Sequence, residues 1–205
     1  MATVLIVSKT QMKNGVCVGG INEDTHELIR IHNDHGGNLA ADAPYEIGDR
    51  WSMSVETAWN VRQAPHTEDK QTTPLNKIGN VGIQGIKDYV YRNSALLRVA
   101  RGSIANAFIG TLHFVGTKNH ICYVCHPNVP QYSTEFWIAD KDLTHSIQFD
   151  KHYYYYDNVR IKFVGFQDPV NRIPAGTIIR LSLANWWDDG SGEERCYLQL
   201  SGWYL

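Results

Sequence analysis

The segment from Val4 to Gly20 restricts the fold of this chain more than any other stretch. Its apolar run Val4–Val7 favours a buried strand, because β-branched residues dominate it. Asn14-Gly15 marks a turn, since Asn and Gly adopt positive φ at low cost. The pair Gly19-Gly20 allows the backbone to bend sharply or to approach a neighbour closely. The segment therefore predicts a β-hairpin at the start of the chain.

The tip of this hairpin is a candidate ligand contact. It is expected to carry Lys9, Thr10, Gln11, Met12 and Lys13. Polar and cationic groups on a rigid turn are well placed to hold a ligand. The alternative is that Lys9 and Lys13 only keep a surface loop solvated.

Composition limits the classes of protein that this chain can represent. Its 205 residues fit one large domain or two domains of about 100 residues each. A net charge of −2 does not indicate a polyanion partner, so a nucleic-acid site would depend on a local patch. The 11 tyrosines and 6 tryptophans favour strands and also supply stacking surfaces.

The sequence also predicts a compartment. No segment approaches the ~20 apolar residues of a membrane span, and we find no secretory signal. The 4 cysteines (Cys17, Cys122, Cys125 and Cys196) are too few and too scattered for a disulfide framework. We therefore expect a cytoplasmic protein with reduced thiols and no membrane segment.

Most of the remaining chain is predicted to be β. A helix is expected over Gly82–Asn93, because Ile83, Ile86 and Val90 recur at nearly helical spacing. The polar segment 63–73 is not expected to form a core element, and residues 26–32 have the pattern of a half-buried strand. Strands are expected at residues 26–32, 45–55, 107–115, 120–124, 135–139, 157–165, 177–183 and 195–203. Such regularly spaced short strands indicate a small barrel or sandwich, with two strand sets dividing near residues 94–104.

Cysteine and histidine gather at residues 120–126. Cys122, Cys125 and His126 match the C-x-x-C-H spacing of haem attachment, which requires an exported protein. With His120 they could form a zinc site only if the strand ended in a knuckle, because Cys122 and Cys125 point to opposite faces of a strand. Buried thiols are favoured, and we expect no metal and no cofactor.

The loop Pro65–Lys70 holds the densest set of ionisable groups in any predicted loop. His66 with Glu68 or Asp69 could perform acid–base chemistry or bind a divalent ion. The alternative is a solvated loop without such a role.

Aromatic residues supply further candidates. A C-terminal hairpin with its turn at Asp189–Gly192 would place Trp186 and Trp187 where they could stack on a base or close the end of a barrel. Trp51, in the middle of a strand, is more typical of a core residue. The run Tyr153–Tyr156 alternates between two faces if extended, so two of its rings would face solvent or a ligand, although a role in core packing and strand pairing is favoured.

Three segments together resemble the dual OB-containing domain of bacteria (OB, oligonucleotide/oligosaccharide-binding). They are Ile6–Gly20 with its Ser-Lys-Thr-Gln-Met string, Pro65–Asp69, and Ser182–Trp203 with Leu-Ala-Asn-Trp and Cys-Tyr-Leu-Gln-Leu-Ser-Gly-Trp. The resemblance implies a mainly β protein with two small OB-like barrels joined by a short helical connector. The first would cover residues 1–95, including the connector, and the second residues 96–205.

The resemblance further implies a role with nucleic acid, in bacterial defence or another mobile-element conflict. The positions that match the family's motifs and could line one groove are Lys9, Thr10, Met12, His66, Glu68 and Asp69.

The leading hypothesis is a non-enzymatic module that binds single-stranded nucleic acid or a modified nucleotide. Lys9, Lys13 and Arg30 would contact phosphate or sugar. The stacking candidates are Trp51, Trp186 and Trp187. Two alternatives stay open: an enzyme acting on nucleic acid or nucleotide through Lys9, His66, Glu68 and Asp69, or a scaffold that recruits an effector encoded nearby.

Overall fold

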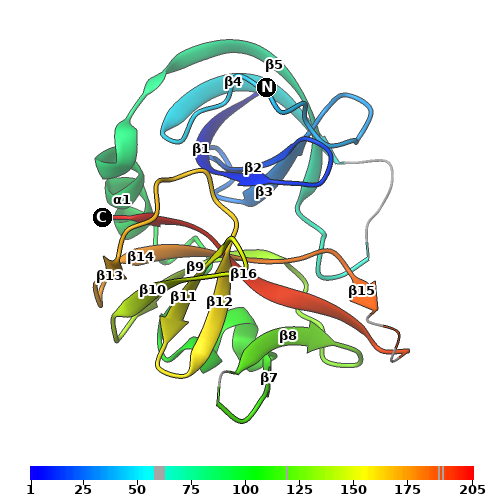
Figure 1. Ribbon diagram of the computed structural model, residues 1–205. Helices are drawn as coiled ribbons and strands as arrows, with labels where there is room; N and C mark the ends of the chain where they lie inside the picture. The colour runs from blue at the N-terminus through cyan, green and yellow to red at the C-terminus, as the bar shows by residue number, and fades with distance from the viewer. Residues whose placement is uncertain (58–62, 119, 189, 191) are drawn as a thin grey trace. The chain divides into compact units, whose positions relative to one another are not determined.

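The computed structural model describes residues 1–57, 63–118, 120–188, 190 and 192–205 (Figure 1). These residues form two compact units that are not continuous in sequence. The first contains Met1–Gln63, Thr67–Arg98 and Tyr204–Leu205, and the second contains Ala64–His66 and Val99–Trp203.

The first unit is built on a closed five-stranded barrel. The strands are β1 (Ala2–Gln11), β2 (Val16–Asn22), β3 (Leu28–His32), β4 (Asp49–Thr57) and β5 (Asp69–Asn80). Their order is β1-β2-β3-β5-β4, and β3 pairs with β5 in parallel while the other neighbours are antiparallel. A closed five-stranded barrel with this crossing order is the OB architecture that the sequence led us to expect.

Alternating apolar side chains fill the barrel, and a glycine allows two strands to approach. Val4 and Ile6 of β1 point into the core with Ile29 and Ile31 of β3. Between them lies Gly20, where an added Cβ would be only 2.6 Å from Val4 Cγ1. Of the two paired glycines in the opening segment, Gly20 therefore permits close packing inside the barrel.

The predicted contents of the first hairpin tip were partly wrong. Pairing between β1 and β2 continues to Gln11 and Val16, so Lys9 and Thr10 are strand residues, and both are buried. The turn itself contains Met12–Gly15, with the Met12 N–H donating to Gly15 O at 3.1 Å. Gly15 has a φ of 93° in this turn, a conformation that glycine adopts at low cost.

Strand β5 and helix α1 complete the first unit. The expectation that residues 63–73 form no core element was wrong from Asp69 onward, because β5 begins there and pairs along β4. The polar Thr72 is accommodated because its Oγ1 donates to His32 O at 3.0 Å. Helix α1 (Gly82–Arg92) confirms the predicted helix, and its Ile86 is fully buried.

The second unit repeats the strand order of the first. Its main strands are β9 (Thr134–Ala139), β10 (Leu143–Gln148), β11 (Lys151–Tyr156), β12 (Val159–Phe163), β14 (Ile178–Leu183) and β16 (Glu194–Tyr204). The pairing path runs β10-β11-β12-β16-β14-β9, and β9 leads directly into β10 along the chain. β9 and β10 can be counted as two halves of one bent first strand, with β11, β12, β14 and β16 as strands 2 to 5. The spatial order is then again 1-2-3-5-4, and the parallel pair β12–β16 corresponds to the parallel pair β3–β5.

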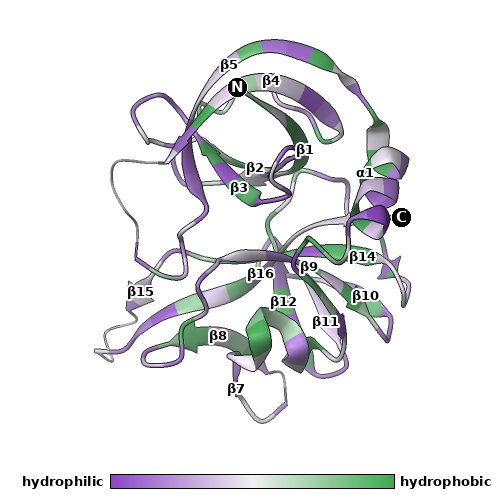
Figure 2. Ribbon diagram, turned by 180° about the vertical axis from the view of Figure 1, so that it is seen from behind, coloured by the Kyte–Doolittle hydropathy of each residue, from purple (hydrophilic) through white to green (hydrophobic). Residues whose placement is uncertain are grey.

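Shorter elements extend this framework into a larger sheet. They are β6 (Val99–Gly102), the 3₁₀ segment η1 (Ile104–Gly110), β7 (His113–Val115), β8 (Ile121–Cys125), β13 (Arg172–Ile173) and β15 (Trp187–Asp188). Figure 2 shows hydrophobic and hydrophilic residues mixed along main strands such as β10 and β16, as expected where one face packs on a core. Pairing of β15 with β16 agrees with the predicted C-terminal hairpin, whose turn includes residues 189 and 191, outside the described residues.

The predicted strand at residues 107–115 was wrong over most of its length. Phe108, Ile109 and Gly110 have positive φ values of 50°, 53° and 72°, which an extended strand does not allow. Phe108 is fully buried and its N–H donates to the Glu135 carboxylate, so core burial and a buried acceptor stabilise this conformation. Among the described residues, no helix has the length and apolar character needed to cross a membrane.

Candidate nucleic-acid interface

OB barrels typically bind ligands across their second and third strands and the adjoining loops. The corresponding surfaces are β2 with β3 in the first unit and β11 with β12 in the second. These two surfaces differ in exposure and in chemistry.

The third strand of the first barrel is buried along its whole length, which corrects the prediction of a half-buried strand. Arg30 Nε lies 3.3 Å from Asp69 Oδ1, and His32 Nε2 lies 3.2 Å from the same oxygen. Burial by itself lowers the pKa of the Arg30 guanidinium. The interactions of Arg30 with Cys17 and Asp69 have a larger, opposite effect, so the pKa is raised. Arg30 thus belongs to a buried charged cluster.

The other residues of the first unit that were predicted to contact the ligand differ in burial and in hydrogen bonding. Lys9 Nζ donates to Ala43 O at 2.9 Å, and Thr10 Oγ1 donates to Cys17 O at 3.3 Å. In the turn, Met12 is half-buried and Lys13 is exposed.

Trp51 packs edge-on against Tyr45, with ring centroids 5.1 Å apart, and borders the core of the barrel. This agrees with the core packing that its mid-strand position favours. As ligand contacts, all these residues stay predictions.

The acidic histidine segment is divided between the two units. His66 belongs to the second unit, where its Nε2 lies 3.1 Å from Ala184 O and 3.8 Å from Cys196 Sγ. Glu68 belongs to the first unit and forms an ion pair with Arg98 at 3.4 Å. His66, Glu68 and Asp69 are each 4% exposed, so a solvated loop was the wrong alternative for them. Their catalytic role with Lys9 stays a prediction.

The cysteines of residues 120–126 are packed in the second unit. Burial raises the pKa of Cys122 to about 12, which leaves it a protonated, unreactive thiol. Within the described residues, no three His, Cys, Asp or Glu side chains are placed to hold a metal ion.

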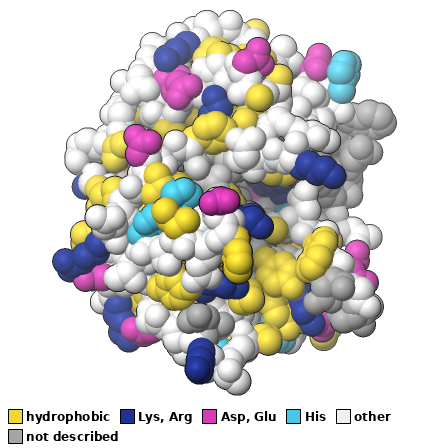
Figure 3. Space-filling model, in the orientation of Figure 1, with side chains coloured by type: hydrophobic (Ala, Val, Ile, Leu, Met, Phe, Trp, Pro, Cys, Tyr) yellow, Lys and Arg dark blue, Asp and Glu magenta, His cyan; other side chains and the backbone are white. Residues whose placement is uncertain are grey.

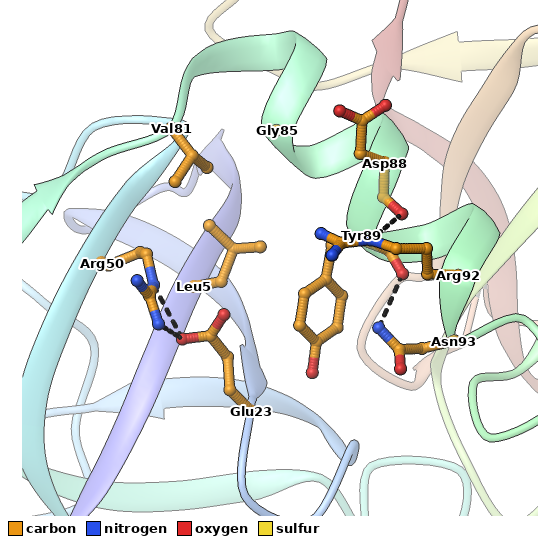
Figure 4. Close-up of a pocket in the computed structure, with 9 residues that line it drawn as sticks. All are labelled: Leu5, Glu23, Arg50, Val81, Gly85, Asp88, Tyr89, Arg92 and Asn93. Atoms are coloured by element: carbon orange, nitrogen blue, oxygen red, sulfur yellow. Dashed lines mark hydrogen bonds and ion pairs between the residues drawn. The ribbon is translucent and has the colours of Figure 1, made fainter.

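A pocket of about 380 Å³ lies between the first barrel and α1 (Figure 4). Arg50 Nη2 pairs with Glu23 Oε2 at 2.7 Å, and Arg92 Nε donates to Asp88 O at 3.1 Å. Because positive and negative groups balance there, the pocket offers no excess of positive charge to an anion.

The outer surface of β11 and β12 combines aromatic and cationic side chains. Tyr154 and Tyr156 lie in the core, so Tyr153 and Tyr155 point outward and are partly exposed. On β12 the outward residues are Arg160 and Lys162, which pair in register with Tyr155 and Tyr153. We call Tyr153, Tyr155, Arg160 and Lys162 the tyrosine face.

The tyrosine face is held in place by its own contacts. The Arg160 guanidinium lies 4.9 Å from the Tyr153 ring centroid, and its Nη1 donates to Gln148 Oε1 at 2.9 Å. Gln148 Nε2 in turn donates to the Tyr155 hydroxyl at 2.6 Å. Figure 3 shows hydrophobic side chains, a class that there includes tyrosine, interspersed with lysine and arginine in the region of β12, β16 and β15.

The two flanking loops carry further aromatic residues. Phe149, in the turn between β10 and β11, is 93% exposed and has a φ of 51°. In the connection between β14 and β16, Trp187 is 55% exposed. Its neighbour Trp186 is partly buried, stacks on His126 with centroids 5.0 Å apart, and donates to Ala64 O at 3.2 Å. Trp187 therefore presents more free ring surface than Trp186.

The tyrosine face was not among the sites predicted from the sequence. The signal was nevertheless present, because Tyr153–Tyr156 alternates and Val159–Phe163 places Arg160 and Lys162 between apolar residues. Two adjacent strands with this alternation predict one apolar and one aromatic–cationic surface.

Two OB-ordered units in one chain define a dual-OB protein. The sequence matches the family model of the dual OB-containing domain over residues 2–203, and the chain belongs to this family. Neither curated proteins nor solved structures gave a significant match.

Proposed function

We propose that this protein binds single-stranded nucleic acid on the tyrosine face of its second OB unit. The observation that carries the proposal is the pairing of Tyr153 with Lys162 and of Tyr155 with Arg160 on an accessible OB surface. The surface corresponds to the strands with which OB barrels commonly bind oligonucleotides.

The physical basis is stacking combined with phosphate attraction. Each base stacked on an aromatic ring contributes about 1–3 kcal/mol, with little dependence on sequence. Arg160 and the exposed Lys162 supply positive charge beside the rings, which a net charge of −2 for the chain does not prevent. Because Arg160 is already bonded to Gln148, less side-chain freedom is lost on binding.

Fluorescence anisotropy with labelled oligonucleotides tests this function. Tyr155→Ala is expected to weaken binding about tenfold, since one stacked base is lost. Lys162→Ala is expected to weaken binding and to reduce the salt slope by about one, as measured between about 50 and 200 mM salt. Tyr91→Ala, an exposed tyrosine on α1 of the first unit, is the matched control.

Unchanged affinity in Tyr155→Ala, or wild-type binding without salt dependence, would contradict the proposal. Lys9, Lys13, Arg30 and Trp51 are tested by the same titration, because each was also predicted to contact the ligand.

We further propose that this binding serves a bacterial defence or mobile-element conflict system and that a protein effector is encoded nearby. The family resemblance supports this context. A nuclease or helicase gene beside this one is the expected finding, and its consistent absence across related genomes would contradict it.

A further inference from the structure

The beginning of β16 lies in a small antiparallel sheet appended to the barrel order, β15-β16-β8-β7. One aromatic side chain from each strand forms a row across this sheet: Trp187, Tyr197, Tyr123 and His113. Ring centroids are 6.0 Å apart for Trp187 and Tyr197, 5.7 Å for Tyr197 and Tyr123, and 5.7 Å for Tyr123 and His113. We call these four residues the aromatic row.

Strand register places the aromatic row on the same sheet surface as the tyrosine face. Lys162 of the tyrosine face pairs with Gln199 of β16, and paired residues point to the same side. Tyr197 precedes Gln199 by two residues, so it points to that side as well. The alternate residues Cys196 and Leu198 are buried in the core on the opposite side.

The aromatic row has the chemistry of a stacking platform. Trp187 is 55% exposed, and the rings of Tyr197 and His113 are partly exposed. Tyr123 lies between Tyr197 and His113 in the row and is buried, with the Arg195 guanidinium 4.7 Å from its ring centroid. Arg195 Nε also pairs with Glu193 at 2.7 Å, which fixes the cation beside the row.

We infer that the aromatic row extends the single-strand site, so that one nucleic-acid strand crosses both the tyrosine face and the appended sheet. This inference rests on the proposed function. β8 begins directly beside β12, because His120 forms a bridge with Val159. Three steps between neighbouring strands therefore separate β11 from β7, which at about 4.8 Å each gives about 14 Å. A stacked strand rising about 3.4 Å per nucleotide needs about five nucleotides to cover that distance. A trinucleotide is therefore too short to reach both surfaces.

A length series separates the two surfaces. Affinity is measured for a trinucleotide and a dodecanucleotide, each as oligothymidylate and as oligouridylate, by anisotropy at about 50 mM salt. Trp187→Ala is expected to weaken dodecanucleotide binding about tenfold and to leave trinucleotide binding unchanged. Tyr155→Ala is expected to weaken both, and Trp187→Phe, which keeps a ring, is expected to bind the longer strand nearly as well as wild type. Thermal melting of each variant checks that it is folded.

The results of this length series either support or overturn the inference that the aromatic row extends the single-strand site. Loss confined to the longer strand in Trp187→Ala supports the inference. If Tyr155→Ala loses binding while Trp187→Ala and a second row variant, Tyr197→Leu, bind both lengths like wild type, the inference fails and the proposed function stands. If wild type binds neither length, both are overturned.

Discussion

Substitution of Tyr204 tests whether burial of this side chain stabilises the first unit. Although it lies at the end of β16, it belongs to the first unit, is 1% exposed, and donates its hydroxyl to Val7 O at 2.6 Å. Tyr204→Ala removes a buried aromatic ring, which typically lowers the free energy of unfolding by about 3–5 kcal/mol. Tyr204→Phe keeps the ring and removes only the hydroxyl donor, for an expected loss of about 1–3 kcal/mol.

Urea denaturation followed by far-UV circular dichroism measures both losses. With a slope of about 2–3 kcal/mol per molar urea, Tyr204→Ala should lower the transition midpoint of the first unit by about 1–2 M. Leu205→Ala is the matched control, because this neighbouring side chain is 50% exposed and its truncation should change the free energy of unfolding by less than about 0.5 kcal/mol. A midpoint for Tyr204→Ala equal to that of Leu205→Ala would refute the argument that this tyrosine completes the first barrel.

Three further predictions concern single sites in the two units. Asp49 is fully buried, and although burial opposes its ionisation, hydrogen bonds led by that from Lys77 lower its pKa below 3.8. Asp49→Asn should therefore lower the free energy of unfolding by about 1.5–3 kcal/mol at neutral pH. In an acid denaturation series the difference from wild type should begin to fade near pH ~4, where the unfolded carboxylate takes up a proton, and should be lost once the pH falls below the lowered native pKa; a difference independent of pH would count against this. Gly20→Ala should lower stability by about 1–3 kcal/mol, because its Cβ would lie 2.6 Å from Val4 Cγ1, and adding Val4→Ala should return part of that loss in thermal melts. Cys122, with a pKa of about 12, should resist thiol reagents in the native protein and react only after unfolding, and rapid native labelling detected by mass spectrometry would argue against this burial.

Local periodicity predicted much of the fold. The run Val4–Val7, the helical spacing of Ile86 and Val90, and the alternation of Tyr153–Tyr156 each appear in the structure as the sequence indicated. These features depend on neighbours within a few residues, which is the range over which sequence patterns report directly. The 3₁₀ segment at Phe108 escaped prediction because its conformation depends on Glu135, 27 residues away.

The candidate site was less predictable for the same reason. Arg30 and Asp69 look like surface charges in the sequence, but parallel pairing of β3 with β5 brings them together and buries them. Sequence alternation shows that Tyr153 and Tyr155 share one face, but it cannot show whether that face stays open. The sequence alone determined which residues share the two surfaces of each strand. Tertiary structure decided which OB surface is buried and which is accessible, because those outcomes depend on strand pairings between distant segments.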